Sequence, residues 1–385
     1  MEKILLGSIA DIQTGPFGSQ LHKEDYVQDG TPIVTVEHLG NRVFTEQNLP
    51  MVSDADKERL NKYVLSEGDI VFSRVGSVDR CSYVDSNHSG WMFSGRCLRV
   101  RPYNAIYPLY LYYFFCMENT KQFVRNIAVG ATMPSINTKL MGEIEVSVPS
   151  IDTQKRIAAI LSAIDDKIEL NTAINENLEQ QAQAIYAQMF IESAEESWGT
   201  GSLSDISVIT MGQSPKGDTF NETGEGAVFY QGRTDFGFRF PTRRLYTTEP
   251  KRIALCGDAM MSVRAPVGDL NVAYEECCIG RGLAAIHSKD NHQSFVLYTL
   301  FTLKKQLDVF NGEGTVFGSI NKESLNSMEI TIPPMELMDR FESIVSPIDR
   351  AIRNNYEEIC RLQAIRDTLL PKLMNGEIDV SAVKI

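Results

Sequence analysis

The feature of this 385-residue sequence that most constrains its fold is an internal duplication with a nearly constant offset. Ser135-Ile136-Asn137 recurs as Ser319-Ile320-Asn321. The same separation of 184 positions joins three further pairs, namely Pro149 and Pro333, Arg156 and Arg340, and Asp165 and Asp349. A repeating unit of this length can bury its own core, so the pattern predicts a domain duplication and not a solenoid. The chain is therefore expected to contain two similar domains.

The offset drifts in the first part of each copy, where Leu6–Gly15 matches Leu203–Gly212. Such drift is expected when loops of different length interrupt a common frame. Short apolar segments typical of β-strands alternate with Gly-rich loops in both copies, and one helix is predicted in each, near Pro108–Glu118 and Ser294–Lys305. The predicted fold class is α+β, present twice.

A long amphipathic helix is predicted after each globular copy. Apolar positions after residue 152 recur at alternating spacings of four and three, a heptad pattern, and the pattern returns 184 positions later. The predicted seam consists of Ile157, Leu161, Ile164, Ile168, Asn171, Leu178, Ile185, Phe341, Val345, Ile348, Ile352, Asn355, Leu362 and Leu369. Helices of about 40 residues, roughly 60 Å, are too long for one small domain to bury. We therefore expect the two helices to pair as an antiparallel coiled coil.

Asn171 and Asn355 occupy the same heptad position in the two helices. A polar residue in a coiled-coil seam typically fixes register and orientation at some cost in stability. The alternative is a solvated turn of the seam. In an antiparallel pair, the two Asn side chains would face each other only if the helices overlap fully.

These patterns divide the chain into four segments. We predict a first globular domain, a first helix, a second globular domain, and a second helix with a C-terminal tail, over residues 1–150, 151–198, 199–333 and 334–385.

The net charge of −13 argues against a nucleic-acid partner, because phosphate binding normally requires a basic surface. Its distribution weakens that objection. Residues 151–200 contain nine acidic and three basic residues, so nearly half of the excess lies on the first helix. The globular segments are closer to neutral, and the second contains arginine-rich stretches such as Arg239–Arg244. A local basic surface is compatible with the acidic total.

The sequence suggests a cytoplasmic protein without a membrane partner. Its most apolar run, Tyr107–Met117, is too short to span a bilayer, and no basic start followed by an apolar stretch marks the N-terminus. Seven cysteines without C-x-x-C spacing predict neither a disulfide framework nor a zinc site. We therefore expect reduced, structural thiols.

An inventory of catalytic motifs argues against an enzyme. The sequence lacks the (D/N)-P-P-(Y/F) loop of amino-methyltransferases, since its one Pro-Pro pair, Pro333-Pro334, is followed by Met335. It also lacks a P-loop and an H-E-x-x-H pair. We expect no catalytic residues, no cofactor and no metal.

The order of the segments resembles the specificity subunit of a Type I restriction-modification enzyme, over essentially the whole chain. A repeated SIN…VP(S/P)…R…ID pattern joins each globular domain to its helix. Gly257–Asp269 and Ile279–Leu283 are similar to a recurrent type of target recognition domain, and Leu369–Ile378 is similar to the usual end of the second conserved helix.

This resemblance implies a non-catalytic subunit. Each target recognition domain would read one half of a bipartite site in double-stranded DNA, while the helices set the gap and hold two methyltransferase (modification) subunits. ATP-dependent restriction subunits, which translocate and cleave, can join such a core. The alternative is a coiled-coil scaffold that presents two protein-binding domains, which fits the acidic balance better and predicts no basic cleft.

Base-edge readout favours Arg, Lys, Asn and Gln, so the candidate DNA-binding residues are polar and basic side chains of the variable loops. They are Gln20, His22, Lys23, Arg42, Arg74, Lys216, Gln231, Arg233, Arg239, Arg243, Arg244 and Arg264. For each, a structural ion pair or a solvated surface charge is the alternative. Arg74 and Arg264 both follow a Gly-Asp strand, so the duplication suggests a shared role for them.

Overall fold

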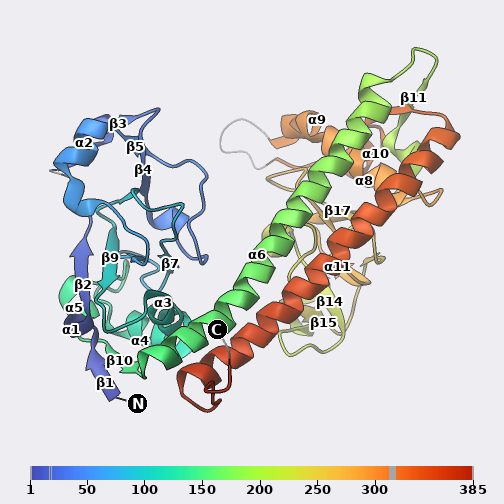
Figure 1. Cartoon of the computed structure of the whole chain (residues 1–385). Helices are drawn as coiled ribbons and strands as arrows, with labels where there is room; N and C mark the ends of the chain where they lie inside the picture. Colours follow the sequence, from blue (N-terminus) through green and yellow to red (C-terminus); the bar gives the residue numbers. More distant parts are fainter. Residues whose placement is uncertain (1, 17, 19, 312–317, 384–385) are drawn as a thin grey trace. The chain divides into compact units, whose positions relative to one another are not determined.

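The protein, described by a computed structural model, divides into two compact units (Figure 1). Unit 1 comprises residues 1–171 and 357–385, and unit 2 comprises residues 172–356. Each unit contains one globular domain and one part of each long helix. The structure describes residues 2–16, 18, 20–311 and 318–383.

The globular domain of unit 1 is built on two four-stranded sheets. The first is antiparallel with the order β2-β9-β6-β7, formed by Ala10–Thr14, Cys97–Pro102, Ile70–Ser73 and Cys81–Tyr83. The second has the order β3-β5-β4-β8, formed by Tyr26–Val27, Met51–Val52, Thr31–Val34 and Met92–Phe93, with β4 and β8 parallel. A separate antiparallel pair joins β1 (Glu2–Leu5) to β10 (Glu145–Val148). The helices are α1, α2, α3, α4 and α5, over Leu6–Ile9, Asp54–Arg59, Pro108–Cys116, Glu118–Ile127 and Thr138–Gly142.

Unit 2 repeats this arrangement. Its antiparallel sheet has the order β12-β20-β17-β18, formed by Ser207–Met211, Leu283–Ser288, Ala259–Ser262 and Leu270–Val272. The second sheet has the order β13-β15-β14-β19-β16, formed by Phe220–Asn221, Tyr246–Thr247, Ala227–Tyr230, Cys277–Ile279 and Ile253–Ala254, with β14 and β19 parallel. A further pair joins β11 (Gly199–Ser202) to β21 (Glu329–Ile332). The helices are α7, α8, α9 and α10, over Leu203–Ile206, Gln293–Thr302, Lys304–Asp308 and Lys322–Asn326.

Strand β6 and helix α3 are almost entirely apolar because both are buried in the core of the domain. All four residues of β6 are buried between two neighbouring strands. Helix α3 has Pro108 in its first turn, where the missing N–H costs nothing, and a helix that is apolar all round must be buried. Its Phe115 packs edge-on against Phe72 of β6, with ring centroids 4.7 Å apart. The α+β prediction for both copies is confirmed.

The repeated Ser-Ile-Asn motif has a structural explanation. The Ile is buried in each copy, at 1% exposure for Ile136 and 4% for Ile320. The Asn caps a short helix that the sequence pattern missed, because the side chain of Asn137 accepts the Leu140 N–H at the start of α5. Asn321 does the same at the start of α10. The prediction of one helix per globular copy was therefore wrong. The five-residue helices α5 and α10 are too short to show a periodicity, and α4 follows α3 almost directly along the chain.

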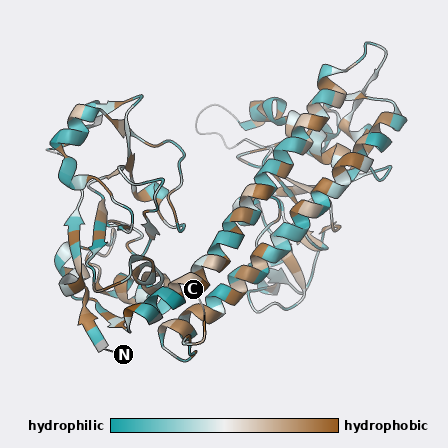
Figure 2. Cartoon of the chain, in the orientation of Figure 1, coloured by the Kyte–Doolittle hydropathy of each residue, from teal (hydrophilic) through white to brown (hydrophobic). Residues whose placement is uncertain are grey.

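The two long helices, α6 (Ile151–Ala187) and α11 (Met335–Met374), run antiparallel within each unit (Figure 1). In unit 1, Asp165 pairs with Arg366 and Asn171 with Glu358. In unit 2, Asn175 pairs with Asn355. The partner number falls as the α6 number rises, which confirms the predicted antiparallel pairing. Figure 2 shows hydrophobic and hydrophilic residues alternating along both helices.

All the predicted seam positions are buried or half-buried. Asn171 and Asn355 do not face each other, however. The Nδ2 of Asn171 donates to Glu358 Oε2 at 2.9 Å, whereas Asn355 Nδ2 donates to Asn175 Oδ1 at 2.8 Å. Asn175 in turn donates to the carbonyl oxygen of Ile352 at 3.2 Å. The seam therefore contains satisfied polar contacts, which restrict the register more than apolar contacts do.

Among the described residues, each helix is either too short or too polar to cross a lipid bilayer.

Exposed cysteines should react with a thiol reagent faster than buried ones. Cys256 and Cys360 are exposed. Burial raises the pKa of Cys97 and of Cys277 to about 12, so few of these thiols are ionised at neutral pH. We expect iodoacetamide to label Cys256 and Cys360 quickly in the native protein and all seven cysteines in the unfolded protein, as read by peptide mass spectrometry. Fast native labelling of Cys97 or Cys277 would contradict this assignment.

Candidate nucleic-acid interface

Two arginines lie side by side at one end of the central strands of the main sheet in unit 1, where Arg74 follows β6 and Arg96 precedes β9. Ser73 of β6 pairs with Cys97 of β9, and one residue further the Arg74 N–H donates to the carbonyl oxygen of Arg96 at 2.8 Å. Residues 94–97 form a tight turn, since the Cys97 N–H donates to Ser94 O at 2.9 Å. Arg96 is exposed and Arg74 half-buried.

The corresponding strands of unit 2 end in the same way. Ser262 of β17 pairs with Leu283 of β20, and the Val263 N–H donates to Gly282 O at 2.9 Å. The flanking residues Arg264 and Arg281 are both exposed. We call Arg74, Arg96, Arg264 and Arg281 the strand-end arginines. Within the described parts of the chain, no ion pair is formed by Arg96, Arg264 or Arg281.

The backbone register corrects the expected equivalence of Arg74 and Arg264. Arg74 N and Val263 N make equivalent hydrogen bonds, so Arg74 corresponds to Val263, which is 2% exposed. Arg264 corresponds to Val75, because each forms a bridge to the Ser of the repeated motif. Neighbouring strand positions face opposite sides. The duplication therefore retains two arginines at the same strand ends, but not at the same register positions.

A glycine packs closely against the backbone of each turn. The Gly15 N–H donates to Cys97 O at 3.2 Å, and the Gly212 N–H donates to Leu283 O at 2.9 Å. A Cβ atom on Gly15 would overlap the carbonyl oxygen of Ser94, and one on Gly212 would overlap that of Gly280. A side chain at either glycine would push the turn away from its strand. The close approach thus holds each arginine-bearing turn in place.

In unit 1 the turn borders a hollow of about 570 Å³. Arg74 and Arg96 line it together with Tyr26, Glu37 and Ser94. One guanidinium nitrogen of Arg74 donates to Gly95 O at 3.1 Å, which orients the side chain. Arginines at such an edge can donate two parallel hydrogen bonds to a guanine edge or bind a phosphate.

The structure places the other predicted residues of the first domain differently. Gln20 Oε1 accepts a hydrogen bond from Tyr63 at 2.7 Å, and His22 is exposed with its Nδ1 3.6 Å from Asp25. The side chain of Lys23 lies outside the described part of the chain.

Arg42 lies against helix α6 and not at the turn. Its guanidinium pairs with Asp166 and Glu169, each at 2.5 Å. Burial alone would lower the pKa of Arg42, but these ion pairs raise it overall. The alternative of a structural ion pair therefore describes Arg42 better than base contact.

Most of the predicted residues in the second domain are exposed. Lys216, Gln231, Arg233, Arg243 and Arg244 all reach the surface. The three arginines are held by carboxylates, since Arg233 pairs with Asp269, Arg243 with Glu275 at 2.5 Å, and Arg244 with Asp235 at 2.8 Å. Gln231 lies beside the turn, because Gly280 and Gly282 pack directly on its backbone.

Arg239 corrects another expectation, because it is only 5% exposed. Its guanidinium lies 3.0 Å from Glu179 Oε1, 3.0 Å from the Tyr298 hydroxyl and 3.4 Å from Asp349 Oδ1. An arginine enclosed in this way cannot reach a base edge. The alternative of a structural ion pair therefore describes Arg239 better than base contact.

Sequence reasoning missed Arg96 and Arg281 as candidate residues. A signal was available, because a Gly-Arg dipeptide precedes the last strand of the main sheet in both copies, as Gly95-Arg96 and Gly280-Arg281. Only the strand pairing identifies these dipeptides as turns beside Arg74 and Arg264.

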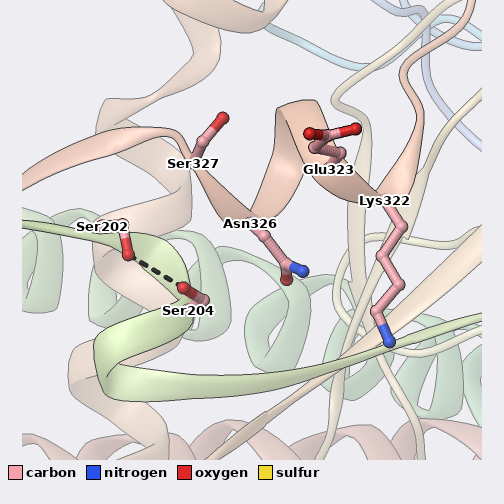
Figure 3. Close-up of a pocket in the computed structure, with 6 residues that line it drawn as sticks. All are labelled: Ser202, Ser204, Lys322, Glu323, Asn326 and Ser327. Atoms are coloured by element: carbon pink, nitrogen blue, oxygen red, sulfur yellow. Dashed lines mark hydrogen bonds between the residues drawn. The ribbon is translucent and has the colours of Figure 1, made fainter.

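A second hollow, of about 500 Å³ in unit 2, is a weaker candidate. Its lining side chains do not converge on one point (Figure 3), and Ser202 Oγ is engaged with Ser204 Oγ at 2.8 Å. It presents one cation and one anion, Lys322 and Glu323, and no arginine. The strand-end arginines remain the better interface.

Comparison with known proteins identifies the family to which this chain is similar. Residues 1–180 and 195–362 match the family model described as Type I restriction modification DNA specificity domain. The type I restriction enzyme MjaX specificity subunit assigned in Methanocaldococcus jannaschii is 31% identical, over 93% of this chain and 89% of that protein. The HindI specificity subunit of Haemophilus influenzae is 22% identical, over 82% of this chain and 88% of that protein.

A solved structure supports the fold. The S subunit of a Type I restriction-modification system from M. genitalium superposes with a TM-score of 0.60 at 16% identity, over 97% of this chain and 95% of that chain. The two matched segments contain the two globular domains described above, and each includes a strand-end turn. The chain therefore belongs to the family of Type I restriction-modification specificity subunits, with two DNA specificity domains.

Proposed function

We propose that each globular domain reads one half of a bipartite site in double-stranded DNA. The paired helices set the gap between the half-sites and hold two methyltransferase subunits, which perform the chemistry. ATP-dependent restriction subunits can join this assembly. The observation that carries the proposal is the strand-end arginines, which occur in both domains at the ends of the same two strands.

Two arginines side by side at the end of a sheet repel each other, because like charges on neighbouring strands are unfavourable. A ligand that offers hydrogen-bond acceptors or negative charge relieves this repulsion when it binds. The major-groove edge of guanine offers two acceptors that match one guanidinium, and phosphate oxygens offer others. Shifted register positions in the two domains fit the reading of two different half-sites.

The negative net charge of the chain suggests that the partner subunits contribute to DNA binding. With a net charge of −13, the chain alone should bind DNA weakly, since sequence-independent affinity comes from basic groups that neutralise phosphates. The methyltransferase subunits would then supply much of the phosphate contact, while this chain supplies the base contacts. Strong and specific binding by the isolated chain would contradict this division.

The test is selection from a random duplex library by the complex of this chain with its co-purified methyltransferase. We expect two short defined blocks around a fixed undefined gap. Arg264→Ala with Arg281→Ala should degrade one block only, and Arg74→Ala with Arg96→Ala only the other. Each bidentate contact is worth about 1–3 kcal/mol, so discrimination at the affected positions should fall roughly five- to 150-fold.

Arg125→Ala is the matched control, because Arg125 of helix α4 is paired with Asp79 and Glu118 and is not among the candidate DNA-binding residues. It should leave both blocks unchanged. Loss of both blocks from one variant pair, or of neither, would count against one domain per half-site. If even the unmodified complex enriches no sequence, a coiled-coil scaffold with protein-binding domains becomes the better description.

A further inference from the structure

An arginine, a tyrosine and an aspartate connect the globular domain of unit 1 to helix α6. The Tyr113 hydroxyl of α3 donates to Asp165 Oδ2 at 2.7 Å. Arg42, from the loop after β4, pairs with Asp166 and Glu169 on the same face of α6. Burial raises the pKa of the Tyr113 hydroxyl, and the charge of Arg42 opposes that rise. Asp165 is 6% exposed, so the Tyr113–Asp165 hydrogen bond is shielded from water, whereas the Asp166 and Glu169 carboxylates reach the surface.

Unit 2 contains the same trio. The Tyr298 hydroxyl of α8 donates to Asp349 Oδ1 at 2.9 Å and accepts from Arg239 at 3.0 Å. Arg239 also pairs with Asp349 and with Glu179. We call Arg42–Tyr113–Asp165 and Arg239–Tyr298–Asp349 the Arg–Tyr–Asp clamps.

The two clamps are equivalent in the fold. Arg42 O accepts the Tyr83 N–H at 2.7 Å, and Arg239 O accepts the Val272 N–H at 2.8 Å. Tyr83 and Val272 lie on the equivalent edge strands β7 and β18, so both arginines lie beside the same edge of the main sheet. The members correspond at different offsets, 197 positions for the arginines, 185 for the tyrosines and 184 for the aspartates. The loops between them have changed length, but each tyrosine hydroxyl still donates to its aspartate, and each arginine still pairs with carboxylates of the long helices.

Each clamp engages both long helices. In unit 1, Asp165 of α6 also accepts from Arg366 of α11 at 3.0 Å. In unit 2, Arg239 bridges Glu179 of α6 and Asp349 of α11. The domain is therefore tied to the helix pair and not to one helix alone. Apolar contacts around the clamp hold the domain against the helices, but they are non-directional and do not by themselves fix its angle. A planar guanidinium bound to fixed carboxylates restricts rotation as well as distance.

We propose that the Arg–Tyr–Asp clamps are positioning residues that fix the angle of each recognition domain on the helices, and thereby the number of undefined base pairs between the half-sites. This proposal rests on the proposed function. Each added base pair moves a half-site by about 3.4 Å and turns it by about 35°. A domain that cannot rotate on its helices rejects such a change, whereas a loosened domain tolerates it.

The test uses Tyr113→Phe, alone and combined with Tyr298→Phe, in the complex with the methyltransferase. Phenylalanine keeps the buried ring and removes the hydroxyl that links domain to helix. The selected half-sites are placed in duplexes whose gaps differ by one or two base pairs on either side of the preferred length. The unmodified complex should prefer one gap length. In the double variant, that preference over neighbouring lengths should fall roughly tenfold, with both half-site blocks unchanged.

Tyr110→Phe is the matched control, because Tyr110 lies on the same helix α3 and its hydroxyl donates to Ser147 O within the domain, at 2.8 Å. It should leave the gap preference intact. Asp165→Asn provides a second variant, which keeps the shape of the carboxylate and removes its charge, and it should also broaden the gap preference.

Three results would overturn the proposal. The gap preference stays narrow in both clamp variants, or the control broadens it equally, or the clamp variants lose the half-site blocks themselves. In the last case the clamp supports the recognition loops and not the spacing. Failure of the proposed function is distinguishable from all three, because the unmodified complex would then select no bipartite sequence at all.

Discussion

Replacing Arg239 with alanine should lower the free energy of unfolding of unit 2 by about 3–5 kcal/mol. The arginine is 5% exposed, and its removal leaves the Glu179 and Asp349 carboxylates and the Tyr298 hydroxyl without their shared partner. Breaking a buried ion pair by deleting one side costs more than the pair contributed, because the remaining charge stays desolvated.

The two tryptophans allow this loss to be measured in the full chain. Trp91 lies in unit 1 and Trp198 in unit 2, where it packs against the core. In a Trp91→Phe background, the fluorescence of Trp198 during urea denaturation reports unit 2. Arg243→Ala is the control, since an exposed ion pair contributes at most about 1 kcal/mol. Equal losses in the two variants would show that the buried network adds no stability.

The pH dependence provides an independent check on the Arg239 variant. Burial raises the pKa of Glu179 above its ordinary value, and Arg239 opposes that rise. Without Arg239, the folded state should favour the protonated carboxyl more strongly than the unfolded state does. Stability then falls as pH rises above the ordinary carboxyl range, so the cost of Arg239→Ala should be smaller near pH 4.5 than at pH 7. A pH-independent cost would contradict this explanation.

Phe341→Ala should destabilise unit 2 by about 3–5 kcal/mol as well, for an apolar reason. Phe341 of α11 is 0% exposed, and its ring centroid lies 5.2 Å from that of Phe190 and 5.6 Å from that of Tyr186. These rings join the two helices to Phe295 of α8. Truncation removes buried apolar surface and leaves a cavity that rigid neighbours cannot fill.

Met335→Ala is the control for Phe341→Ala, because Met335 begins the same helix and is 49% exposed. Its replacement should change stability by no more than about 0.5 kcal/mol. The same Trp198 fluorescence in urea measures both variants. A loss below about 1 kcal/mol for Phe341→Ala would mean that the aromatic cluster relaxes around the missing ring, and that the attachment of α11 depends on other contacts.

Much of the architecture could be predicted from local patterns. The constant offset of 184 positions indicated two copies of one fold, and the four-three spacing indicated two paired helices. Both signals are local and repeat many times, so errors at single residues average out. The strand-end turns were visible as repeated Gly-Arg dipeptides, but nothing in the sequence distinguishes a turn arginine from any other exposed cation.

The division into units required the tertiary structure. Sequence patterns predict a globular domain followed by its own helix, at residues 1–150 and 151–198. The compact units instead split each helix, near Asn171 in α6 and near Tyr356 in α11. Antiparallel pairing is the reason, because it places the last turns of one helix beside the first turns of the other, next to the same domain.

The sequence by itself determined the duplication, the heptad seam and the kinds of residue available for recognition. The tertiary structure decided what each arginine does. Arg42 and Arg239 look like loop cations in the sequence but meet carboxylates more than 100 positions away, whereas Arg96 and Arg281 stay exposed. The role of a charge depends on its partners and on its burial, and both are set by contacts that local sequence does not encode.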